Sequence, residues 1–95
     1  MFNILVVDDE KNASVYMEAV LKKNNYRVFT ASDGEEALDA LDREHIDLVL
    51  LDIMMPNMDG YEFTQTVRAV DGTLPILMIS AKQLPDDRHK GFLAG

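Results

Sequence analysis

Three aspartates follow two short apolar segments of the chain, and their carboxylates could together hold a metal ion. Asp8 and Asp9 come directly after residues 2–7, and Asp52 comes directly after residues 46–51. Segments this short and this rich in Ile, Val and Leu are typical of buried strands in a parallel sheet. In such sheets the ligand crevice lies at the carboxyl ends of the strands, so we expect the three side chains to converge.

Carboxylates at such close range repel one another unless a cation lies among them. Hard divalent cations prefer oxygen ligands, and the pattern therefore predicts a Mg²⁺ site. A carboxylate held by Mg²⁺ can also attack phosphorus and form an acyl phosphate, and Asp52 would lie at the end of a central strand beside Asp8 and Asp9. Ser80 follows the apolar residues 76–79, and its hydroxyl could contact the phosphoryl group. The alternative is that each Asp only ends a strand or caps a helix, and that Ser80 is an ordinary strand-end hydroxyl.

The elements that would position these residues alternate between strand and helix, which indicates an α/β fold of stacked βαβ units. Strands are expected at residues 2–7, 26–31, 46–51 and 76–79, and helices at 11–23, from Ser32, at 61–70 and from Pro85 toward Gly95. The first helix should end at Asn24 and Asn25, because Asn tolerates the left-handed conformation common after a helix.

Apolar spacing within the helices predicts how they pack. The first helix carries pairs at i,i+4 spacing, namely Val15/Ala19, Tyr16/Val20 and Met17/Leu21. The second should begin with an S-x-x-E capping box, Ser32 to Glu35, and turn three side chains inward, Ala37, Leu38 and Leu41. The third should turn three more inward, Phe63, Val67 and Val70.

Composition limits the class of protein. The chain has 95 residues, of which 47% are hydrophobic and 27% are charged, as in one soluble globular domain. It contains no Cys, which excludes disulfides and thiolate metal sites. No apolar run approaches the roughly 20 residues of a membrane span, so we expect a cytoplasmic protein without membrane contact. The net charge of −8 argues against direct nucleic-acid binding by this domain.

Four stretches together resemble the receiver domain of two-component response regulators, and the resemblance covers the whole chain. They are ILVVDDE at 4–10, ASDGEEAL at 31–38, DLVLLDIMMPNMDGYEF at 47–63 and PILMISAK at 75–82. The resemblance implies a flavodoxin-like, doubly wound parallel sheet of order 2-1-3-4, with the family's fifth strand missing from this chain. Residues 1–95 would then form one receiver domain that is incomplete at its C-terminus.

The resemblance also implies roles for the acids. Asp52 matches the phosphoacceptor, which takes a phosphoryl group from a phosphohistidine of a sensor histidine kinase. Asp9 and Asp52 match the direct Mg²⁺ ligands, and Asp8 acts through water. The backbone carbonyl of Met54 matches the remaining protein ligand.

Four further residues match the surroundings of that site. Ser80 matches the switch hydroxyl that turns onto the phosphoryl group, and Ala81 matches the small residue that leaves access to it. Pro56 and Gly60 match the loop that forms the pocket rim. The family implies that such a domain catalyses only its own phosphorylation and dephosphorylation, and that it controls an output domain such as a DNA-binding transcription regulator.

Two other functions stay open. A degenerate receiver that binds partners without phosphate is one, because the Lys that the family carries in its last strand is missing from this chain. A Mg²⁺-dependent phosphatase of the dehalogenase type is the other, although its D-x-D pattern would need Asp where Glu10 stands. Without a fifth strand the edge at residues 76–79 would be exposed, so we also expect self-association through that edge or a swapped element.

Overall fold

Strands and helices alternate along the chain, and the computed structural model describes residues 1–52, 55 and 59–79. The elements in chain order are β1 (Asn3–Val7), α1 (Lys11–Lys23), β2 (Arg27–Ala31), α2 (Gly34–Arg43), β3 (Leu48–Asp52), α3 (Gly60–Val70) and β4 (Ile76–Ile79). These bounds confirm the predicted elements to within two residues. The helix predicted from Pro85 lies outside the described residues.

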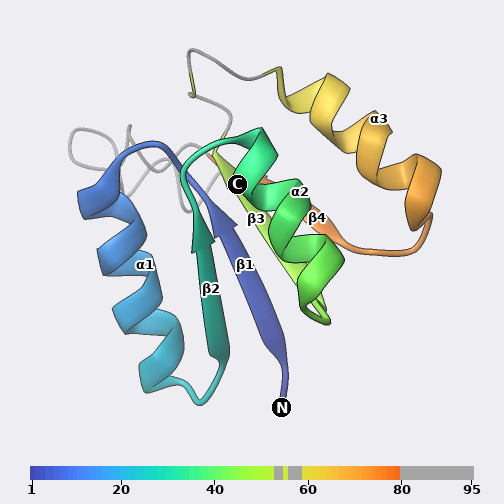
Figure 1. Ribbon diagram of the computed structural model, residues 1–95. Helices are drawn as coiled ribbons and strands as arrows, with labels where there is room; N and C mark the ends of the chain where they lie inside the picture. The colour runs from blue at the N-terminus through green and yellow to red at the C-terminus, as the bar shows by residue number, and fades with distance from the viewer. Residues whose placement is uncertain (53–54, 56–58, 80–95) are drawn as a thin grey trace.

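The four strands form one parallel sheet in the order β2-β1-β3-β4, which confirms the order expected from the resemblance. β1 and β3 are neighbours, and their register pairs Val7 with Leu51. Parallel neighbours end at the same edge of a sheet, so the residues that follow Val7 and Leu51 must emerge side by side. Figure 1 shows this edge at the tips of the strand arrows.

Helices cover both faces of the sheet, with α1 on one face and α2 and α3 on the other (Figure 1). Successive strand side chains point to opposite faces, so Leu5 and Val7 join the core under α2 and α3, and Ile4 and Val6 join the core under α1. All four are at most 2% exposed. This two-sided burial is why the strands read as continuous apolar runs. None of the helices in the described ranges has the length and apolar character needed to cross a membrane.

Only one of the apolar pairs on α1 contacts the sheet. Met17 and Leu21 pack against the core on that face, whereas Val15, Tyr16 and Val20 are 55%, 64% and 41% exposed. The row of α1 side chains that faces the sheet is therefore the Met17/Leu21 row.

Two side chains predicted to point inward do not, and the predictions for Leu38 and Val70 are wrong. Leu38 is 38% exposed, because the small residues Ala37 and Ala40 form the buried row of α2. Val70 is 89% exposed at the last position of α3, where the chain leaves the helix for the loop that leads to β4 (Figure 1). Phe63 is buried as predicted.

The cap of α2 lies one residue later than predicted. Asp33, not Ser32, is the N-cap, and its Oδ1 accepts a hydrogen bond of 2.8 Å from the backbone N–H of Glu36. The Glu36 carboxylate in turn accepts from the backbone N–H and the hydroxyl of Ser32. Ser and Asp are both strong caps, and here Asp33 and Glu36 take the places predicted for Ser32 and Glu35.

The turn after α1 contains Asn25, whose φ of 71° is the one positive value among the described non-glycine residues. We expect Asn25→Gly to retain or raise the free energy of unfolding, since Gly has no Cβ to strain. Asn25→Val should lower it by about 1–2 kcal/mol, because a β-branched residue fits this conformation poorly. Urea unfolding followed by circular dichroism measures the free energy of unfolding of both variants. A Val variant as stable as the parent would contradict the left-handed conformation of Asn25.

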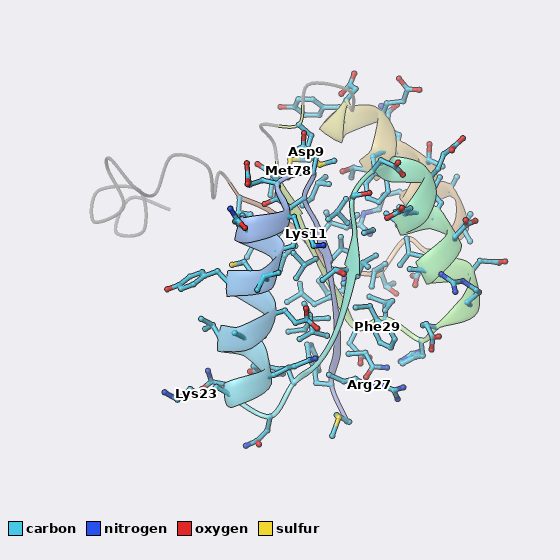
Figure 2. All side chains as sticks on the ribbon, turned by 60° about the vertical axis from the view of Figure 1, so that its left-hand side comes forward. Asp9, Lys11, Lys23, Arg27, Phe29 and Met78 are labelled. Carbon is cyan, nitrogen blue, oxygen red and sulfur yellow. The ribbon has the colours of Figure 1, made fainter. Side chains whose placement is uncertain are left out.

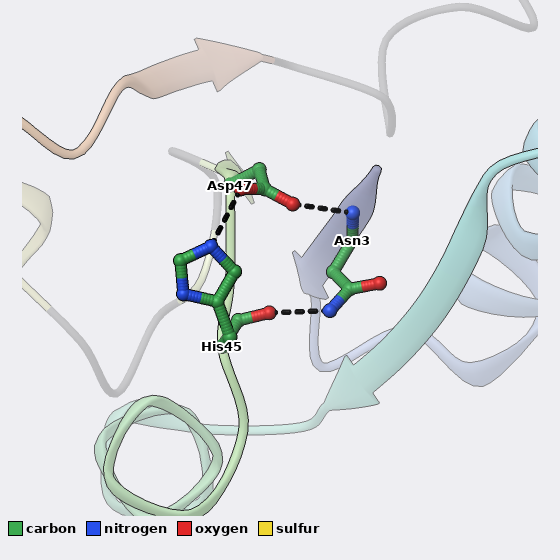
Figure 3. A network of polar contacts seen from close by, with 3 residues as sticks. All are labelled: Asn3, His45 and Asp47. Carbon is green, nitrogen blue, oxygen red and sulfur yellow. Dashed lines mark hydrogen bonds and ion pairs between the residues drawn. The ribbon is translucent and has the colours of Figure 1, made fainter. Parts of the chain in front are cut away.

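A polar network joins the amino ends of β1 and β3 (Figure 3). The backbone N–H of Asn3 donates to Asp47 Oδ2 at 2.8 Å, and His45 Nε2 lies 2.9 Å from Asp47 Oδ1. The Asn3 side-chain amide donates to the backbone carbonyl of His45. The bond from the Asn3 backbone, with the nearby His45, holds the pKa of Asp47 below its ordinary value.

This lowered pKa predicts a loss of stability in acid. A carboxyl whose pKa is lower in the folded state stabilises the fold above its unfolded pKa, and that contribution disappears as the pH falls through the folded pKa. The melting temperature of the parent should therefore exceed that of Asp47→Asn near pH 6, and the difference should shrink between about pH 5 and pH 3. If the difference in melting temperature stayed constant over this pH range, the charge of Asp47 would not contribute to the stability of the fold.

Candidate metal centre

The carboxylates of Asp8, Asp9 and Asp52 converge at the carboxyl edge of the sheet. One oxygen from each lies within 4.8 Å of the others, and no other such group of three possible ligands occurs in residues 1–52, 55 and 59–79. Asp8 and Asp52 are 3% and 1% exposed, whereas Asp9 faces solvent. The convergence expected from the sequence is therefore present, and the functional roles of the three residues stay predictions.

The sheet itself brings the acids together. Val7 and Leu51 are paired across β1 and β3 and are fully buried, which fixes the backbone on both strands. Asp8 and Asp52 are the next residue on each strand, so they emerge as neighbours. The Asp8 backbone N–H still donates to the carbonyl of Ala31 on β2, at 3.0 Å.

The side chain of Asp8 is oriented by the start of α1. Its Oδ1 accepts a hydrogen bond of 2.8 Å from the backbone N–H of Glu10, which is the residue before the helix. The Ser14 hydroxyl, buried on α1, donates to the Asp8 backbone carbonyl at 3.4 Å. Asp8 thus ends its strand, shapes the entry to α1 and faces the other two acids.

Sequence reasoning missed the contribution of Ser14. The signal is its position, because Ser14 lies on the same helical row as Met17 and Leu21, the row that faces the sheet. A hydroxyl in an apolar row needs a hydrogen-bond partner when buried. The partner here is the backbone next to the acidic cluster.

The three carboxylates form a donor set that fits a hard divalent cation. They offer oxygen ligands only, and Mg²⁺ is usually held by one or two carboxylates together with water. Two of the acids are buried, where like charges repel more strongly than they do in water. A cation among them would offset that repulsion, and the exposure of Asp9 leaves one side of the cluster open to solvent.

Two basic residues, Lys23 and Arg27, lie at the end of the molecule away from the acidic cluster. Figure 2 shows Asp9 at the end toward which the strands point, Lys11 at the start of α1 nearer to that end, and Lys23 and Arg27 at the opposite end. A cation approaching the carboxyl edge therefore meets the acidic cluster and not these two bases.

The other predicted site residues are only partly described. Gly60 is the first residue of α3, and a Cβ built on it would lie 3.7 Å from a Leu51 methyl and 3.9 Å from the Met78 methyl. It therefore packs closely on β3 and β4, and its role at a pocket rim stays a prediction. The remaining predicted residues lie outside the described part of the chain: Met54, Pro56, Ser80 and Ala81.

The chain is similar in sequence to a known protein family and to characterised members of it. The family model for the response regulator receiver domain matches residues 4–95. The heme response regulator HssR of Staphylococcus epidermidis is 36% identical over 95 residues, which is all of this chain and 42% of HssR. The alkaline phosphatase synthesis transcriptional regulatory protein PhoP of Bacillus subtilis is 42% identical over 92 residues, which is 97% of this chain and 38% of PhoP. The chain thus spans about two fifths of the length of these curated relatives.

A solved structure resembles the fold closely. TrrA of Thermotoga maritima, a response regulator solved in complex with the histidine kinase ThkA, gives a TM-score of 0.78 at 38% identity, over 85% of this chain and 70% of TrrA. TrrA in complex with Mg²⁺ and beryllofluoride gives 0.72 at the same identity, over 83% and 67%. The flavodoxin-like fold is therefore shared with a protein that was crystallised with a histidine kinase in one structure and with Mg²⁺ and beryllofluoride in another.

Proposed function

We propose, from the premise that this chain belongs to the response regulator receiver domain family, that Asp52 is the residue on which it is phosphorylated. Receiver domains are signalling modules and not classical enzymes. The observation that carries the proposal is the convergence of three aspartate carboxylates from two neighbouring strands within 4.8 Å.

In the proposed step, an Asp52 carboxylate oxygen attacks the phosphorus of a phosphohistidine. The new O–P bond makes an acyl phosphate, the N–P bond breaks, and its electron pair returns to the histidine ring. Bound Mg²⁺ would supply positive charge to the phosphoryl oxygens and to the carboxylates. Asp9 and Asp52 would hold the ion directly, with Asp8 acting through water, and the Glu10 N–H keeps Asp8 in place.

The other proposed residues act around this step. The Met54 carbonyl would be a further ligand, Ser80 would hydrogen-bond the phosphoryl group, and Ala81 would leave room for it. Pro56 and Gly60 would shape the entrance. The chain would catalyse its own phosphorylation from small acyl phosphates and its own dephosphorylation, without turning over a metabolite.

A sensor histidine kinase is the proposed phosphate donor. The proposal is supported by TrrA, a related response regulator that was solved with its kinase. An output domain that regulates transcription is proposed because PhoP, which is longer than this chain, is a transcriptional regulatory protein. Direct nucleic-acid binding by this domain is not proposed, in view of its net charge of −8. The cytoplasmic location stays a prediction.

Self-association through β4 is a further proposal carried over from the sequence. In the described part of the chain, β4 pairs with β3 alone, and Leu77 and Met78 on it are 54% and 37% exposed. An exposed apolar edge strand can pair with a second chain. Exchange of an element between two copies would cover the same edge.

Metal binding tests the proposal without any phosphate. We expect the parent chain to bind Mg²⁺ in isothermal titration calorimetry, and Asp9→Asn to weaken binding by roughly ten-fold, because one of three carboxylate charges is removed. Asp42→Asn is the matched control, since Asp42 is exposed on α2 away from the cluster. Equal affinities for Asp9→Asn and the parent would exclude Asp9 as a ligand.

A further inference from the structure

A hollow of about 580 Å³ lies between α2 and α3, away from the acidic cluster. Its lining comes from the C-terminal halves of both helices and from the segments that lead into β3 and β4. These segments lie at the amino ends of the strands, whereas Asp8, Asp9 and Asp52 lie at the carboxyl ends. We call this hollow the α2–α3 groove. Its volume is within the range of clefts that hold ligands, about 300–1,000 Å³.

The floor and sides of the α2–α3 groove are apolar. Ile46, Val67 and Leu74 are 8%, 3% and 6% exposed and belong to the main core. Leu38 and Val70 stand on either side, 38% and 89% exposed, on α2 and α3 respectively. Among the side chains that apolar periodicity predicted to face the sheet, these are the two for which the prediction was wrong. They line the groove instead, where a partner could cover them.

The rim of the groove is acidic. Four carboxylates line it, those of Asp39, Asp42, Glu44 and Asp71, and the lining contains no Lys or Arg. The side chains of the first three make no ion pair or hydrogen bond within the described residues. The backbone N–H and hydroxyl of Thr73 donate to the fourth, and this holds the pKa of Asp71 below its ordinary value. All four are therefore placed to meet positive charge from a partner.

The neighbouring bases make their hydrogen bonds elsewhere, although Arg68 lies close enough to Asp71 to contribute to its lowered pKa. Arg43 donates to the backbone carbonyl of Asp39, and Arg68 donates to the backbone carbonyls of Asp71 and Leu74. His45 lines the groove, and its ring pairs with Asp47 at the amino end of β3. Within the described residues, none of these three bases is hydrogen-bonded to a rim carboxylate.

We propose that the α2–α3 groove binds a cationic amphipathic helix of a partner protein. The apolar side of that helix would cover Leu38 and Val70, and its Lys or Arg side chains would meet the four rim carboxylates. Helices commonly bind in this way, with apolar anchors in a groove and complementary charges at its rim. A second copy of this chain fits poorly, because its net charge of −8 would oppose an acidic rim. The proposal does not depend on phosphorylation of Asp52.

The test uses the whole 95-residue chain and a fluorescently labelled model peptide of about 14 residues. Leu residues at i, i+3, i+4 and i+7 spacing form one side of its helix, and Lys residues form the other. Fluorescence anisotropy is measured in excess Mg²⁺, so that the acidic cluster at the other end of the sheet does not compete for the lysines. We expect binding that weakens with added salt. Val70→Lys should reduce the affinity by at least about ten-fold, because it removes an apolar contact and adds a like charge. Val15→Lys on α1, where Val15 is 55% exposed, should change the affinity by less than about two-fold.

A double variant, Asp39→Asn with Asp42→Asn, changes the rim without touching the floor and should also weaken binding. Amide chemical shifts should move on the facing sides of α2 and α3. Three results would each overturn the proposal. The first is equal binding by the parent and Val70→Lys, and the second is equal binding of a Leu/Glu peptide with the same apolar pattern. The third is a set of shifts confined to Asp8, Asp9 and Asp52.

Discussion

Replacing Asp52 with Asn is expected to abolish the phosphoryl adduct that forms when the chain is incubated with acetyl phosphate and Mg²⁺. The substitution keeps the size of the side chain, but an amide is not a nucleophile toward phosphorus as a carboxylate is. Asp52 is 1% exposed, and one of its carboxylate oxygens lies within 4.8 Å of one from Asp8 and one from Asp9. In the proposed mechanism those two acids hold the metal, and Asp52 alone attacks phosphorus. Intact mass spectrometry of the parent and the variant measures the adduct directly, and we expect a loss of at least about 100-fold.

The matched control is Asp42→Asn, which makes the same chemical change at an exposed position of α2 and should label as the parent does. An Asp52→Asn variant that labelled as well as the parent would refute the assignment. If the parent itself did not label under conditions in which Mg²⁺ binds, the phosphate-independent interaction module would become the better account.

A second large effect is expected at Leu51, where Leu51→Ala should lower the free energy of unfolding by about 2–5 kcal/mol. Leu51 is fully buried in the core under α2 and α3, pairs with Val7 across the sheet and lies directly before Asp52. Its loss would leave a cavity in the strand pair that positions the acids. A domain of this size has little stability to spare, since domains of this kind unfold with only about 5–15 kcal/mol.

Urea denaturation followed by circular dichroism measures this change, and Leu77→Ala is the control. Leu77 is on the neighbouring strand β4 but is 54% exposed, so its truncation should change the free energy of unfolding by less than about 1 kcal/mol. If Leu51→Ala and Leu77→Ala lowered the free energy of unfolding by similar amounts, the buried position of Leu51 and the exposed position of Leu77 would be contradicted.

The convergence of the acids could be predicted because two simple patterns determine it. Short runs of Ile, Val and Leu predict buried parallel strands, and such strands end at a common edge, so the residues after Val7 and Leu51 must lie near one another. The pattern did not fix the order of the strands. That order came from the resemblance to receiver domains, and family membership also decides against the phosphatase that the sequence alone left open.

The faces of the helices were predicted less well, for a physical reason. Apolar periodicity shows which residues share a side of a helix, but not how far the sheet extends beneath that side. Val70 shares a side with Phe63 yet lies at the end of α3, and Leu38 is displaced by the smaller Ala37 and Ala40. Both errors concern residues that line the α2–α3 groove, so the failed predictions mark the surface that we propose as a binding site.

Hydrogen bonds between side chains and the backbone were also not predicted correctly from the sequence. The cap at Asp33 and the bonds that orient Asp8 depend on which of several polar residues reaches a particular N–H. Ser32 and Asp33 are near-equal candidates by residue type, so only the geometry of the turn decides between them.

The most direct test of the central claim is a crystal structure of the chain with Mg²⁺ and beryllofluoride, which mimics a phosphoryl group on a carboxylate. We predict that the metal will be bound by Asp9 and Asp52 and that beryllium will be attached to an Asp52 carboxylate oxygen. A structure in which Asp52 is unmodified while the metal or the beryllofluoride lies at another residue would contradict the account.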